Sequence, residues 1–105
     1  PAASHYVELG RELATSSLDF ALVDGAFRDH CAAVAIDRLK RGGILIIDNV
    51  ERYIPREKKS TAPVARGLSD GFETAEWAQV FEAIKEWRCV WTTNGVTDTA
   101  FWVKH

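Results

Sequence analysis

Two short apolar segments separated by a helical pattern constrain the fold of this chain more than any other feature. Residues 18–23 are apolar except at Asp19, and residues 44–47 are apolar throughout, which is typical of strands buried on both faces. Between them, apolar side chains recur at one-face helical spacing from Phe27 to Leu39, and the glycine pair 42–43 follows as a helix stop. This order predicts a parallel βαβ unit with a right-handed crossover.

The remaining segments predict an α/β domain around that unit. Residues 4–16 and 74–87 have helical patterns, and residues 89–93 lead through the turn at 94–95 into a last strand on which Thr99, Phe101 and Val103 alternate. The expected fold class is therefore α/β. It is a partial, three-layer, Rossmann-like sheet in which the parallel βαβ unit is followed by a helix and a C-terminal antiparallel β-hairpin.

The length supports one domain, residues 1–105, with a single core, because the chain has 105 residues and a mass of 11.7 kDa. Within it, residues 50–71 contain two prolines, two glycines and a basic cluster. A loop of this length is uncommon in a small domain and is usually a lid, a functional segment or disordered.

Composition excludes several classes of partner. A net charge of −2 gives no argument for binding nucleic acid. The longest apolar run, residues 44–47, is far shorter than the roughly 20 residues of a membrane span, and no signal peptide is recognisable. Cys31 and Cys89 form no C-x-x-C pair and indicate no disulfide framework. A cytoplasmic protein that binds neither nucleic acid nor membrane is expected.

Polar residues follow both predicted parallel strands. Asp24 ends the first strand, and Asp48 and Asn49 end the second. The carboxyl ends of neighbouring parallel strands share one sheet edge, where ligands of open α/β sheets bind. The three side chains could hold Mg²⁺, Mn²⁺ or Ca²⁺, or one carboxylate could act as a base. Equally, Asp24 could cap the following helix and the other two could start a loop.

Other candidate residues lie near this edge. Arg28 could bind an anion at the start of the helix or be a surface arginine, and His30 could reach the crevice or be solvated. The basic cluster could clamp a carboxylate or phosphate or form a solvated loop. Its members are Arg52, Arg56, Lys58, Lys59 and Arg66. The seven glycines form no G-x-G-x-x-G and no G-x-x-x-x-G-K, so no nucleotide-binding fingerprint is present.

Three segments together resemble the class I S-adenosylmethionine-dependent methyltransferases. Residues 19–25, DFALVDG, with Arg28 and Cys31 following, resemble that family's fourth strand and its D-G-x-x-R-x-x-C element. Residues 39–49, LKRGGILIIDN, look like its L-K-x-G-G segment and fifth strand. Residues 87–104, with W-R, T-N-G and D-T-A-F-W-V-K in order, look like its closing hairpin. The resemblance covers nearly the whole chain.

The resemblance implies the carboxyl-terminal half of a methyltransferase that is not active alone, because the glycine-rich cofactor turn belongs to the missing amino-terminal half. It implies S-adenosylmethionine as cofactor, with no cofactor-binding residue in this chain. Catalytic roles are implied for Asp24, Asp48 and Asn49, which also match a divalent-metal site in the metal-dependent members by residue type. The candidate substrate-binding residues are Arg28, His30, Arg52 and Tyr53. The methyl acceptor is not specified.

Without the missing half, the strand at residues 18–23 would have an open apolar edge, which invites pairing with another chain. A homodimer through this edge is therefore expected, unless the missing half covers it. The alternative function is a non-catalytic, homo-oligomeric binding or assembly module derived from the same fold.

Overall fold

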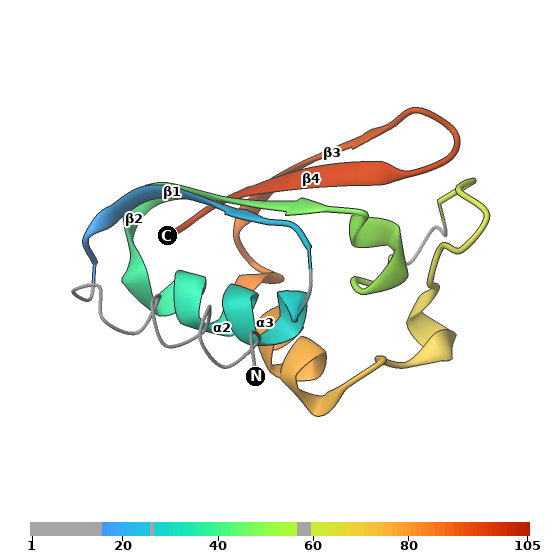
Figure 1. The fold of residues 1–105 in the computed structure, drawn as a ribbon, viewed down its shortest axis with the longest axis horizontal. Coiled ribbons are helices and arrows are strands. Elements are labelled where there is room, and N and C mark those ends of the chain that lie inside the picture. The colour runs from blue at the N-terminus through green and yellow to red at the C-terminus, as the bar shows by residue number, and fades with distance from the viewer. Residues whose placement is uncertain (1–15, 26, 57–59) are drawn as a thin grey trace.

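A computed structural model describes residues 16–25, 27–56 and 60–105. In these residues, four strands form one mixed sheet and two α-helices cover it (Figure 1). The elements are β1 (Leu18–Val23), α2 (Arg28–Arg38), β2 (Leu39–Asp48), α3 (Ala75–Ile84), β3 (Arg88–Thr93) and β4 (Asp98–Val103). The α/β class is confirmed. The helix predicted over residues 4–16 lies outside the described residues.

The sheet order is β1-β2-β4-β3. β1 pairs with β2 in parallel, whereas β4 pairs antiparallel with both β2 and β3. The antiparallel C-terminal hairpin is therefore confirmed. Since α2 connects the two parallel strands, the loops that follow β1 and β2 emerge at the same edge of the sheet. Neither described helix is long and apolar enough to cross a membrane.

Both described helices lie on the same face of the sheet, where they enclose the core (Figure 1). The predicted apolar stripe of α3 packs here, with Trp77, Val80 and Ile84 each about 1% exposed. Leu45 and Ile47 of β2 meet it and are fully buried. Burying side chains of this size stabilises the fold by roughly 1.5–3 kcal/mol each. The sheet and both described helices therefore share one buried core.

The boundary between α2 and β2 differs from the sequence-based prediction. The helix ends at Arg38, and Leu39 already has an extended backbone and is fully buried. The glycine pair lies inside β2: Gly42 has φ +83°, and a Cβ on Gly43 would lie 2.8 Å from the Lys40 carbonyl oxygen. The ammonium of Lys104 instead donates to carbonyl oxygens of Ile36 and Leu39 at the helix end. A contact remote in sequence therefore takes the place of a glycine cap.

The buried face of β4 is opposite to the face that carries Thr99, Phe101 and Val103. Asp98, Ala100 and Trp102 are buried, whereas the alternate set around Phe101 is half-buried. The turn forms as predicted, with Gly95 at φ +89°. A carboxylate, Asp98, is therefore placed on the core side of the sheet.

The described part of the segment 50–71 packs on the core at some positions and is exposed at others, including Arg52 and Arg56 of the basic cluster. It contains two 3₁₀ turns, η1 (Val50–Arg52) and η2 (Leu68–Asp70). Val50 and Ile54 are buried in the core. Arg66 fastens the segment to itself: its backbone N–H donates to the Glu51 carbonyl, and its guanidinium donates to three further carbonyls. Lys58 and Lys59 lie outside the described residues.

Candidate functional site

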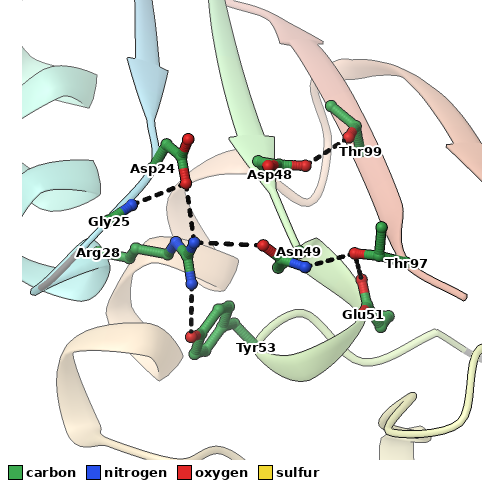
Figure 2. Close-up of polar contacts among 9 residues, drawn as sticks. All are labelled: Asp24, Gly25, Arg28, Asp48, Asn49, Glu51, Tyr53, Thr97 and Thr99. Atoms are coloured by element: carbon green, nitrogen blue, oxygen red, sulfur yellow. Dashed lines mark hydrogen bonds and ion pairs between the residues drawn. The ribbon is translucent and has the colours of Figure 1, made fainter.

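The carboxyl ends of β1 and β2 bring Asp24 and Asn49 together through Arg28 (Figure 2). The Arg28 guanidinium extends from the first turn of α2 and donates through Nη2 to Asp24 Oδ1 at 2.9 Å and to Asn49 Oδ1 at 3.3 Å. Its Nη1 donates to the Tyr53 hydroxyl at 2.9 Å. The residues that directly follow β1, β2 and η1 thus meet at one cation.

Asp48 does not join this group. Its Oδ1 accepts a hydrogen bond from Thr99 Oγ1 at 2.7 Å, and Figure 2 shows the side chain directed toward β4. The next residue, Asn49, has a left-handed backbone with φ 54°, so its side chain leaves in a different direction. The three predicted metal ligands therefore do not converge.

This arrangement does not fit a divalent ion. The guanidinium of Arg28 lies between Asp24 and Asn49, and it already neutralises the carboxylate. A metal ion at this position would have to displace a fixed cation and would gain only one carboxylate, since Asp48 is elsewhere. We therefore assign no metal chemistry to these residues.

Arg28 also sets the electrostatics of the edge. Its hydrogen bond, together with the Gly25 backbone N–H, lowers the pKa of Asp24. Burial opposes the charge of Arg28, but the hydrogen bonds with Asp24 and Tyr53 outweigh it and raise the guanidinium pKa. At neutral pH the edge therefore carries a fixed ion pair, and Asp24 is a weak base suited to orienting a ligand.

The polar chain continues into the interior through residues that the sequence analysis did not identify. Asn49 Nδ2 donates to Thr97 Oγ1, which donates to Glu51 Oε1 (Figure 2). Glu51 is 1% exposed, and its Oε1 also accepts the Asp98 backbone N–H at 2.8 Å. The period-2 spacing of Asp98 with Ala100 and Trp102 is the one sequence signal that could have revealed part of this network.

A pocket of about 320 Å³ opens beside the ion pair. Of the four predicted substrate-binding residues, Arg28, His30 and Tyr53 line it, whereas Arg52 is exposed and does not. Tyr53 stacks on Trp77, with ring centroids 4.7 Å apart and planes 17° apart. The stack holds the phenol in place, and the phenol oxygen accepts a hydrogen bond from Arg28. The pocket offers an aromatic wall, a cation and a hydroxyl.

One further cluster lies at the rim of this pocket. Asp29, His30 and Glu76 each offer a ligand atom within 4.8 Å of the others. Asp29 Oδ2 already accepts a hydrogen bond from Thr74 Oγ1 at 2.8 Å, and Asp29 Oδ1 accepts one from the His30 backbone N–H. Both carboxylate oxygens of Asp29 are therefore occupied by hydrogen bonds at the starts of α2 and α3.

Comparisons of this chain with protein families, with curated proteins and with solved structures find no match in any of the three.

Proposed function

We propose that the chain is the carboxyl-terminal half of an S-adenosylmethionine-dependent methyltransferase and supplies the side of the active site that binds the methyl acceptor. The observation that carries the proposal is the Asp24–Arg28–Asn49 group at the shared carboxyl edge of parallel strands, beside an aromatic pocket. The sheet order supports it, because the two motif-bearing strands are neighbours and the closing hairpin follows them. As part of this proposal, we infer that the described sheet is a portion of a three-layer Rossmann-like fold and that β1, α2 and β2 form its βαβ unit.

In this proposal the chain's residues bind and orient the acceptor. Tyr53 and Trp77 form the apolar wall, and Arg28 together with the Tyr53 hydroxyl provides polar contacts. Asp24 orients its partner as a carboxylate and does not remove a proton, because Arg28 lowers its pKa. Asp48, which accepts a hydrogen bond from Thr99, holds the backbone turn that places Asn49 beside Arg28.

The chain's own residues do not fit S-adenosylmethionine. The sequence has no glycine-rich turn that could approach the cofactor closely. We therefore assign cofactor binding to a preceding half and no step of methyl transfer to this chain alone.

A calorimetric titration with S-adenosylmethionine tests this assignment. The chain alone should give no saturable heat at millimolar cofactor, while a longer product of the same gene that includes a preceding glycine-rich strand–turn should bind one equivalent. Arg28→Gln in the longer product should leave cofactor binding unchanged, since Arg28 lies on the acceptor side. Binding of one equivalent by residues 1–105 alone, or a longer product that lacks such a turn and does not bind, would refute the proposal.

A specific observation also favours the second function, a homo-oligomeric module. β1 is an edge strand of the described sheet, and on the sheet face away from the helices Phe20 and Leu22 are 65% and 60% exposed. Leu22 lies in register with Ile46, Phe101 and Val90, so one apolar row crosses all four strands. Such a row beside an unpaired edge favours association of two chains.

Leu22→Lys is the corresponding test. If two chains associate through β1 and this face, the substitution should raise the dimer dissociation constant by about tenfold or more, because a charge would be buried at the interface. Sedimentation equilibrium measures it. Val64→Lys is the matched control, since Val64 is 49% exposed outside the sheet. A wild-type chain that is monomeric at every concentration would exclude the module.

A further inference from the structure

A second pocket, of about 390 Å³, lies between the end of α3 and the β3–β4 hairpin. Its floor is apolar and fixed: Ile54, Ile84 and Trp102 are each 1–4% exposed. Phe81 and Trp91 stand at its sides and are half-buried. We call it the β3 pocket. Its volume is at the lower end of the range for ligand sites, which restricts an occupant to a small molecule.

The aromatic wall of the β3 pocket has a defined geometry. Trp91 meets Trp102 edge to face, with ring centroids 6.2 Å apart and planes 81° apart. The indole N–H of Trp91 donates to Asp98 Oδ2 at 2.7 Å, which holds the ring in one orientation. The two indoles meet at a steep angle and form an apolar corner of the pocket, against which an aromatic ring would pack.

The charged side chains that line the β3 pocket are cations. The Arg56 guanidinium lies over the Trp91 ring, 4.5 Å from its centroid. Lys85 lies at the end of α3 and shares its charge with Glu82 at 2.8 Å, so Arg56 is the main anchor. Asp98 also interacts electrostatically with Arg56, but the Asp98 carboxylate is buried and does not line the pocket.

Cys89 completes the lining without adding negative charge. Burial raises the pKa of its thiol, against a smaller opposing effect of Arg56, so the group is neutral at physiological pH. No acidic side chain of the described residues lines the pocket. The β3 pocket therefore combines an apolar aromatic wall with a positive rim, to which the Arg56 guanidinium contributes most.

We propose that the β3 pocket is a binding site for a small aromatic carboxylate, with the ring packed on Trp91 and Trp102 and the carboxylate bound by the Arg56 guanidinium. A carboxylate matches the forked N–H groups of arginine better than a neutral amide does. The site is separate from the strand-edge pocket of the proposed function, which Trp77 lines. The inference therefore goes beyond that function and does not rest on it.

The four tryptophans allow the site to be located directly. In ¹H–¹⁵N spectra of the chain, titration with 2-naphthoate should shift the indole N–H signals of Trp91 and Trp102 and leave Trp77 unchanged. Binding should saturate in the millimolar range or below. 2-Naphthamide, which has the same shape without the charge, should bind about fivefold more weakly. Shifts confined to Trp77, or no shift at millimolar naphthoate, would overturn the proposal.

Two variants separate the anchor from nonspecific binding. Arg56→Gln should lower naphthoate affinity about fivefold while leaving naphthamide binding nearly unchanged. Arg41→Gln is the matched control, since Arg41 is exposed on β2 and does not line the pocket. Both changes are at exposed positions, and retained spectra will confirm folding. Equal losses in both variants would show that only net charge matters and would overturn the assignment.

Protection of Cys89 gives an independent readout. N-ethylmaleimide should modify Cys89 more slowly when naphthoate is present, while Cys31 on α2, outside the pocket, serves as the internal reference. Peptide mass spectrometry measures both rates in one sample. Equal rates at Cys89 with and without saturating naphthoate would contradict occupation of the β3 pocket.

Discussion

Trp77→Ala is expected to lower the free energy of unfolding by about 3–5 kcal/mol, the range for large-to-alanine changes in a well-packed core. Trp77 is 1% exposed and is the first and largest buried side chain of the α3 stripe. Domains of this size have total stabilities of about 5–15 kcal/mol, so the variant should be close to unfolding at 37 °C. Urea denaturation followed by circular dichroism measures the loss.

The same substitution should also disorder the strand-edge pocket. Tyr53 stacks on Trp77, and the Tyr53 hydroxyl anchors Arg28. Trp77→Phe keeps an aromatic ring beneath Tyr53 and should cost clearly less than Trp77→Ala. Trp87→Ala is the matched control, because Trp87 is only partly buried. If both tryptophans cost the same, the core is not centred on α3.

The elements that the sequence predicts well are those set by local periodicity. The spacing of Trp77, Val80 and Ile84 is enough to place α3 and its buried face. The end of α2 could not be predicted in this way, because residues 39–43 continue as β2 only through pairing with β1 and with the chain end at Lys104. Tertiary contacts there override a glycine pair that reads as a helix stop.

The candidate site was predictable to the extent that it depends on topology. Parallel strands place Asp24 and Asn49 at one edge, which strand patterns indicate. The sequence cannot show that Arg28 would lie between them or that Asp48 would turn toward Thr99. Those outcomes depend on a left-handed backbone at Asn49 and on side-chain direction, which one-dimensional spacing does not specify.

The buried carboxyl groups could not be predicted either, because their partners are remote in the sequence. The position of Glu51 after a strand end indicates a solvated loop residue, yet its carboxylate accepts the Asp98 backbone N–H in the interior. This contact joins residues 47 positions apart. Through it the strand edge is connected to the start of β4, and the β3 pocket is connected in turn, since Asp98 holds the indole of Trp91. Two linked residues, Glu51 on the side of the strand edge and Asp98 on the side of the β3 pocket, thus support the two candidate sites.

Asp98→Ala is expected to lower the free energy of unfolding by about 3 kcal/mol at pH 7. Asp98 is fully buried, and its Oδ2 accepts from Ser60 Oγ at 2.5 Å and from Trp91 Nε1 at 2.7 Å. Removing the carboxylate leaves both donors without this acceptor, which costs about 1–3 kcal/mol for each unsatisfied buried group. Because the indole of Trp91 is released, Asp98→Ala should also broaden its N–H signal.

The pH dependence of stability distinguishes this carboxylate from an exposed one. Burial opposes ionisation of Asp98, but hydrogen bonds from Ser60, Thr93 and Trp91 and the charge of Arg56 outweigh it and lower its pKa. A lowered folded-state pKa adds stability above the unfolded value of about 3.9, and that stability is lost as the pH falls through the folded pKa.

The difference in unfolding free energy between wild type and Asp98→Asn, which keeps the shape without the charge, should therefore be largest near pH 7 and shrink below about pH 4. Asp19→Ala, at an exposed position whose carboxylate pairs with Lys40 at 3.2 Å, should change stability by about 0.5 kcal/mol or less throughout. Urea denaturation at a series of pH values measures both differences. A wild-type advantage over Asp98→Asn that does not vary with pH would mean that shape alone, and not the charge, holds the start of β4.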